Sequence, residues 1–101
     1  PKAVRPLLLP ERSPGGTIQD VLADGTRVLA AIPSRNEVVV FRAASLTILR
    51  RLYVPGTPTR LIRAADGRRV FVTLETVAGI AEIDLATLKV ATHRLPLPEY
   101  T

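Results

Sequence analysis

One short segment of the sequence occurs twice. Residues 23–28 read Ala-Asp-Gly-Thr-Arg-Val, and residues 65–70 read Ala-Asp-Gly-Arg-Arg-Val, 42 positions later. With this offset residues 22–53 share seven identities with the second copy, and most other apolar positions stay apolar. Upstream, Gly16-Thr17 corresponds to Gly56-Thr57 at an offset of 40, so the second copy carries two extra residues before its Asp-Gly. A chain of 101 residues that contains this repeat is expected to fold as two similar units.

Each copy is predicted to form four short β-strands. β-branched residues are frequent and Pro or Gly recurs every few residues, which disfavours helix. Asp66-Gly67 is a strong hairpin signal between the first two strands of the second copy. A period of about 40–45 residues built from short strands is typical of β-propeller blades. The expected strands are 18–22, 27–32, 37–42 and 47–54 in the first copy, and 59–64, 69–74, 80–84 and 89–95 in the second.

The central strands of both copies are apolar on both faces. Residues 38–41 are Val-Val-Val-Phe, and Val70 and Val72 alternate with Phe71. This pattern indicates a sheet that lies between two neighbours, because a sheet with one solvated face alternates apolar and polar residues. Closed propellers have about 4–8 blades, so two blades leave a face unpaired at each end.

We therefore predict an all-β fold of two four-stranded antiparallel β-propeller blades plus an N-terminal strand, forming part of a larger or oligomeric propeller. Three copies of such a chain would give about six blades and four copies about eight. The expected divisions are an N-terminal segment, 1–15, forming an outer strand of an adjoining blade; blade 1, 16–55; blade 2, 56–97; and a C-terminal tail, 98–101.

The second copy also carries a motif that is similar to a known repeat family. Its elements are Gly56, Pro58, Ala65-Asp66-Gly67, 70–74 (Val-Phe-Val-Thr-Leu), 79–84 (Gly-Ile-Ala-Glu-Ile-Asp) and Thr87. These residues resemble the β-propeller repeats named for a Tyr-Val-Thr-Asn (YVTN) signature, with Phe71 and Leu74 in place of the Tyr and the Asn. The resemblance covers roughly residues 16–97 and is weaker in the first copy. It implies a propeller fold and favours a periplasmic or extracellular location, while related blades serve lactonases, cofactor-bearing dehydrogenases and binding proteins.

Composition excludes several kinds of site. The chain has no cysteine, which rules out disulfides, thiolate metal sites and cysteine nucleophiles. Fourteen Lys and Arg against nine Asp and Glu give a net charge of +5, but the basic residues are scattered and adjacent only at Arg50-Arg51 and Arg68-Arg69. This distribution favours a solvated basic surface over nucleic-acid binding. No apolar stretch approaches the roughly 18–20 residues of a membrane span.

Few side chains are suited to catalysis, and we predict no catalytic residue, no metal site and no cofactor. His93 is the single histidine and is expected to be a polar residue of an outer strand. Glu82 and Asp84 share one side of a strand, an arrangement compatible with an acid/base pair or a hard-cation site. The preferred interpretation is that Asp84 caps the following turn.

Arg60 and Arg63 are the candidate binding residues. Both belong to the innermost strand of the second blade, where some side chains line the central channel of a propeller. Oligomerisation would repeat them around the axis and produce a ring that attracts anionic ligands. The alternative is that they pair with Asp20 or another nearby carboxylate, or face solvent at a strand end.

These observations lead to two hypotheses about function. The first is a non-catalytic propeller scaffold or binding module that self-assembles, or completes a propeller, through its blade faces. The alternative is a fragment of a lactonase-like or redox propeller enzyme with catalytic residues in other blades. The expected partners are further copies of the chain or the remaining blades of a longer one.

Overall fold

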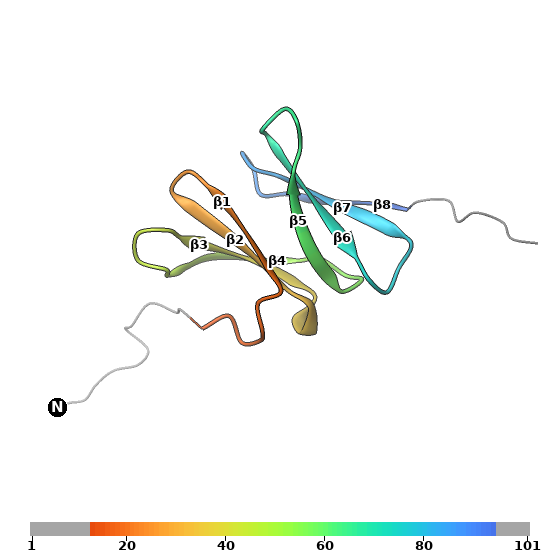
Figure 1. Ribbon diagram of the computed structural model, residues 1–101, viewed down its shortest axis with the longest axis horizontal. Helices are drawn as coiled ribbons and strands as arrows, with labels where there is room; N and C mark the ends of the chain where they lie inside the picture. The colour runs from red at the N-terminus through yellow and green to blue at the C-terminus, as the bar shows by residue number, and fades with distance from the viewer. Residues whose placement is uncertain (1–12, 95–101) are drawn as a thin grey trace, which may run out of the picture.

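The computed structural model describes residues 13–94, which form two four-stranded antiparallel sheets. In both sheets the strands follow one another in chain order (Figure 1). A short 3-10 helix, η2 (Pro33–Arg35), separates two strands of the first sheet. Sheet 1 contains β1 (Asp20–Asp24), β2 (Arg27–Ile32), β3 (Glu37–Arg42) and β4 (Ile48–Tyr53); sheet 2 contains β5 (Pro58–Arg63), β6 (Arg69–Leu74), β7 (Gly79–Asp84) and β8 (Val90–Arg94).

The hairpins between the first two strands of each sheet differ in length. In sheet 1, Asp24 pairs with Arg27 across a two-residue turn in which Gly25 has a φ of 60°. In sheet 2 the last pair is Arg63 with Val70, so the two extra residues of the second copy enlarge this turn. The prediction that the first strand covers 18–22 is wrong by two residues, because the tight turn keeps the chain paired as far as Asp24.

The turns between the third and fourth strands match closely in the two sheets. Leu46 and Leu88, which stand 42 positions apart, both have a positive φ, 58° and 61°. The backbone N–H of each donates to the carbonyl four residues earlier, at 2.7 Å and 2.6 Å. A leucine rarely adopts this conformation, so its presence at both positions confirms that the two sheets are copies of one unit.

The main apolar core lies between the two sheets. It contains Leu29, Ala31, Val38, Val40 and Leu52 of sheet 1 together with Leu61, Val70, Val72, Ala81 and Ile83 of sheet 2. β5 packs against β1 and β2 at this junction. Because side chains alternate along a strand, the residues between these core positions lie on the opposite, outward surface of each sheet.

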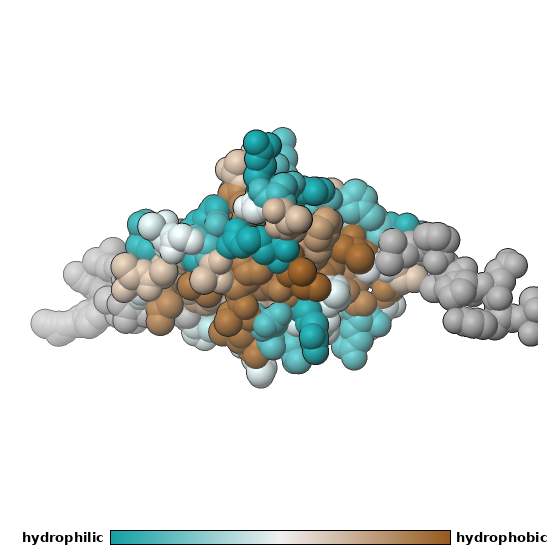
Figure 2. All heavy atoms as spheres, turned by 45° about the horizontal axis from the view of Figure 1, so that its top comes forward, coloured by the Kyte–Doolittle hydropathy of each residue, from teal (hydrophilic) through white to brown (hydrophobic). Residues whose placement is uncertain are grey.

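We call these outward surfaces the far face of sheet 1 (Val28, Ala30, Ile32, Val39 and Phe41) and the far face of sheet 2 (Arg69, Phe71, Thr73, Ile80 and Glu82). The former is apolar and forms a second core cluster, as the sequence predicted. The latter mixes apolar and polar side chains, all of them half-buried. Figure 2 shows apolar side chains gathered in a band across one side of the molecule, with hydrophilic residues above and below it.

The remaining strand boundaries agree with the prediction to within one residue, except that residue 95, the expected end of the last strand, lies outside the described residues. The expected N-terminal strand and the C-terminal tail, 98–101, lie outside the described residues as well. No helix in the described part, 13–94, is long and apolar enough to cross a membrane.

Candidate functional site

The far face of sheet 1 contains an apolar hollow of about 230 Å³. Val21 is 56% exposed there and Leu46 is 55% exposed, which is unusual for side chains of this size. Ala30 of β2 also contributes to the wall. The other lining residues are Pro14, Ile18, Val21, Val28, Phe41 and Leu46.

The segment that precedes β1 crosses the same face. The guanidinium of Arg51 donates to the carbonyls of Pro14 at 3.0 Å and Ser13 at 3.2 Å, and it also binds the Glu37 carboxylate at 2.9 Å. Gly16 packs so closely on Ile32 that a Cβ at residue 16 would lie 2.7 Å from its Cγ2. This segment therefore covers one part of the far face and leaves the hollow beside it open.

The residues of the hollow have counterparts in sheet 2 that are covered. Val21 pairs with Ala30 in sheet 1, and Leu61 pairs with Val72 in sheet 2, which makes Val21 and Leu61 equivalent. Leu61 is only 7% exposed, because the core-facing side of sheet 1 covers it. Val70, Val72 and Ile83, the equivalents of Val28, Ala30 and Phe41, belong to the same buried cluster.

The far face of sheet 2 carries a chain of charged groups. Arg69 binds the carboxylates of Asp66 at 3.0 Å and Glu82 at 3.4 Å, and its guanidinium carbon lies 5.3 Å from the Phe71 ring centre. Glu82 also meets Nε2 of His93 at 3.1 Å. His93 is thus a polar residue of the outermost strand, β8, as predicted.

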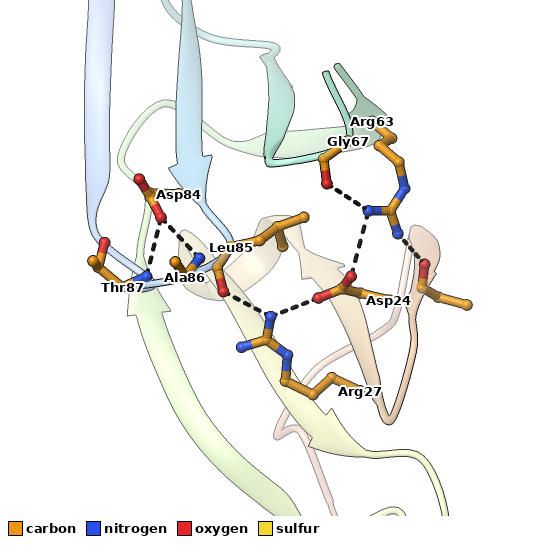
Figure 3. Close-up of polar contacts among 9 residues, drawn as sticks. Asp24, Arg27, Arg63, Gly67, Asp84, Leu85, Ala86 and Thr87 are labelled. Atoms are coloured by element: carbon orange, nitrogen blue, oxygen red, sulfur yellow. Dashed lines mark hydrogen bonds and ion pairs between the residues drawn. The ribbon is translucent and has the colours of Figure 1, made fainter. Parts of the chain in front are cut away.

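A second network joins the two sheets at one rim (Figure 3). Arg27 forms an ion pair with Asp24, and its Nη2 donates to the Leu85 carbonyl of sheet 2 at 2.7 Å. The Asp24 carboxylate also meets Arg63 at 3.4 Å. Near the middle of β5, the backbone N–H of Leu61 donates to Oδ2 of Asp20 at 2.9 Å. These bonds fix the position of each sheet relative to the other.

The structure places the candidate residues Arg60 and Arg63 on opposite faces of β5. Arg63 lies at the interblade rim, where it also donates to the carbonyls of Ala23 and Gly67. Arg60 is exposed, and its guanidinium makes no hydrogen bond or ion pair within residues 13–94. The two guanidinium groups of one chain therefore do not converge on a common ligand position.

Asp84 caps the turn after β7, as preferred from the sequence. Its Oδ1 accepts backbone N–H bonds from Ala86 at 2.8 Å and Thr87 at 3.0 Å (Figure 3). These bonds, led by that from Thr87, hold the pKa of Asp84 below its ordinary value. Asp66 has a lowered pKa for a similar reason, since it accepts the Arg68 N–H at 2.9 Å. Within the described residues no group of three or more His, Cys, Asp or Glu side chains could hold a metal ion.

A further hollow of about 300 Å³ lies at the end of sheet 2 near the β6–β7 turn. Pro55, Leu74 and Val77 supply apolar wall, and His93 and Arg94 supply basic groups. This hollow was not predicted from the sequence, because its walls come from parts of the chain that are distant in sequence.

The comparison with solved structures identifies the architecture. Virginiamycin B lyase from Staphylococcus aureus, crystallised as the selenomethionine-substituted protein, is similar to this chain with a TM-score of 0.71 and 16% sequence identity. The chain has the fold of a β-propeller fragment. The similarity covers 89% of this chain and 31% of the lyase, so the chain spans about a third of the length of that structure.

Sequence comparisons add no assignment. No family model matches the chain, and no curated protein sequence matches it. It is the structural similarity that shows each four-stranded sheet to correspond to one propeller blade.

Two long-range contacts were not predicted from the sequence. The Arg27–Leu85 bond joins residues 58 positions apart, and the Arg51–Pro14 bond joins residues 37 apart. The sequence contains a signal for the Arg27–Leu85 bond. An arginine follows the aspartate of Asp-Gly by three positions in both copies, as Arg27 and Arg69, and few other residues are identical in the two copies.

Proposed function

We propose that the chain is a non-catalytic β-propeller scaffold or binding module, which completes a propeller through its blade faces. The hollow on the far face of sheet 1 is the observation that carries this proposal. Three of its apolar side chains, Ile18, Val21 and Leu46, are 42%, 56% and 55% exposed. Pro58 and Leu61, the equivalents of Ile18 and Val21 in sheet 2, are buried, and Leu61 belongs to the core between the two blades. An apolar surface of this kind is typical of an interaction site.

The divisions 16–55 and 56–97 fit the same proposal as two blade units, with residues 54–57 linking β4 to β5. Pro14 lines the hollow on sheet 1, and Val54, 40 positions later, belongs to the core between the two sheets. This similarity supports the interpretation of 1–15 as the end of an outer strand of an adjoining blade. Assignment to the YVTN type of repeat rests on the motif in residues 56–87.

The first experiment measures the exposure of the hollow. A dilute solution of the folded chain is expected to enhance the fluorescence of an apolar dye, and Val21→Glu is expected to reduce that signal with an unchanged circular-dichroism spectrum. Leu49→Glu is the matched control, since Leu49 is 42% exposed but lies outside the hollow. At a concentration at which size exclusion shows single chains, a folded chain that gives no dye signal, or the same signal in all three proteins, contradicts the proposal.

A second candidate function is a segment of a propeller enzyme whose catalytic residues lie in other blades. The similarity to a third of a lyase supports this candidate. Its test is the coding sequence around the segment for residues 1–101. Four or more further blades in one reading frame favour the enzyme, and stop codons close to both ends favour the scaffold.

An anionic ligand belongs to the first proposal as its binding function. Arg60 is the better candidate, because its guanidinium is exposed while Arg63 is occupied by Asp24 and two carbonyls. Titration with inorganic phosphate is expected to give weaker binding in Arg60→Ala than in the unaltered chain. Equal affinity in the two proteins removes Arg60 from the proposal.

A further inference from the structure

We propose that the far face of sheet 1 binds the far face of sheet 2 of a second copy of this chain. The second copy docks in the register that sheets 1 and 2 already use within one chain. This inference rests on the proposed function, since it names the partner that covers the hollow. It follows from the internal repeat, which places both halves of the interblade interface on the two outward surfaces of the same chain.

The first half of the interface is the hollow. Ile18 and Val21 are 42% and 56% exposed, whereas their equivalents in sheet 2, Pro58 and Leu61, are buried. Leu46 is 55% exposed, while Leu88 packs against the core between the sheets. The hollow therefore has the composition of a surface that already accepts a blade elsewhere in the molecule.

The second half is the far face of sheet 2. Within the chain, Leu29 and Val38 of sheet 1 are fully buried against sheet 2. The residues 42 positions later are Phe71 and Ile80, which are half-buried on the far face of sheet 2. These two side chains are of the right kind to enter an apolar hollow on a second copy.

One polar contact makes the proposed register specific. Arg27 pairs with Asp24 and donates to the Leu85 carbonyl of the next blade. Arg69 forms the equivalent pair with Asp66, and within residues 13–94 no further sheet lies beyond this pair. The position equivalent to Leu85 is Ala43, so Arg69 is expected to donate to the Ala43 carbonyl of the second copy.

This mode of association is head to tail, because it joins two different surfaces of the same chain. Repetition of such a contact closes into a ring when the rotation between copies permits it. The usual range of about 4–8 blades corresponds to rings of about two to four chains, with three chains giving six blades and four chains giving eight.

Cross-linking between introduced cysteines tests the register directly, because the unaltered chain has none. Arg69→Cys combined with Ala44→Cys places two thiols at the proposed contact between copies. Arg27→Cys combined with Ala86→Cys is the matched control, since these positions lie 42 residues from the first pair and, within one chain, Arg27 donates to the carbonyl of Leu85, the neighbour of Ala86. A short bismaleimide is expected to link the control pair inside single chains and the test pair between chains, with the linked series ending at one closed species.

A control pair that links while the test pair stays unlinked overturns the inference. A measurement without cysteines provides a second test: light scattering after size exclusion is expected to give a closed oligomer for the unaltered chain and for Leu49→Glu. Val21→Glu is expected to weaken association by about tenfold or more, because a carboxylate would be buried in an apolar hollow. A folded chain that stays single at micromolar concentration also overturns it.

The two proposals fail separately. A chain that binds the apolar dye through the hollow but does not self-associate retains the proposed function and loses this inference, and the partner is then a blade of different sequence. A chain that neither binds dye nor associates loses both.

Discussion

Replacing Arg27 by methionine is expected to destabilise the chain much more than the same change at Arg69. The two arginines are equivalent in the repeat and both pair with an aspartate three residues earlier. They differ in surroundings, because Arg27 also donates to the Leu85 carbonyl across the interblade rim, and its side chain is 24% exposed against 40% for Arg69. Methionine keeps most of the aliphatic stem, so the comparison isolates the guanidinium group.

The expected magnitudes follow from these environments. A hydrogen bond from a charged donor contributes about 1.5–3 kcal/mol, and partial exposure of Arg27 places Arg27→Met near 2 kcal/mol. Ion pairs between exposed groups are screened by solvent and contribute little, so Arg69→Met is expected to destabilise the single chain much less than Arg27→Met. For a domain of this size the value for Arg27→Met corresponds to a loss in Tm of about 8–16 °C.

The assay is thermal unfolding followed by far-ultraviolet circular dichroism, at a concentration at which size exclusion shows single chains. That condition matters because a docked second copy would give Arg69 its own acceptor. Equal losses of Tm in the two variants would refute the argument, since they would show that the Leu85 carbonyl contributes nothing to the difference. Raising the concentration into the range of assembly is expected to increase the loss caused by Arg69→Met and leave that of Arg27→Met unchanged.

Three further predictions concern turns and strand contacts. Asp84 has a lowered pKa, so its stabilising contribution is present above the unfolded-state pKa and is lost as the pH falls through the folded-state pKa. The difference in urea midpoint between Asp84→Ala and the unaltered chain is therefore expected to narrow as the pH is lowered below the ordinary pKa of an aspartate. Gly79→Ala is expected to cost about 1–3 kcal/mol in urea unfolding, because a Cβ would lie 2.8 Å from the His93 carbonyl oxygen. Gly25→Ala meets no atom within 4 Å and is expected to cost only about 1 kcal/mol through its positive φ, and a larger loss than at Gly79 would contradict the contact argument. Leu46→Asn is expected to stabilise the single chain by about 0.5–1 kcal/mol, seen as a higher Tm, because asparagine relieves the backbone strain of the positive φ. The same change is expected to weaken assembly, and a lower Tm would show that the exposed leucine is needed inside one chain.

The repeat and the turn residues were sufficient to predict the architecture. The boundaries of β2, β3 and β6 follow directly from the sequence, because turn-forming residues flank apolar runs there. The first strand was misplaced because pairing across a two-residue turn depends on the backbone of Gly25 and Thr26. Periodicity alone does not specify where such a turn ends.

The candidate site was only partly predictable. Apolar residues on both sides of the central strands correctly indicated an outward apolar face on sheet 1, and the hollow lies there. The exposure of Val21 and Leu46 depends on the path of the segment that Arg51 holds against this face, which is a contact between distant parts of the chain. Arg60 and Arg63 were correctly placed on one strand. That they lie on opposite faces of this strand was not predicted, because it depends on the register of β5 with β6.

The pairing of two blades in one chain also restricts which complete rings can be built from it. If every copy adds two blades, the total number of blades is always even, so self-assembly of this chain alone cannot produce a ring of five or seven blades. A seven-bladed ring would need one blade of different origin, inserted where the outward surfaces of two copies would otherwise meet. An even or odd number of blades therefore distinguishes a toroid made only of this polypeptide from one that contains a blade of another sequence.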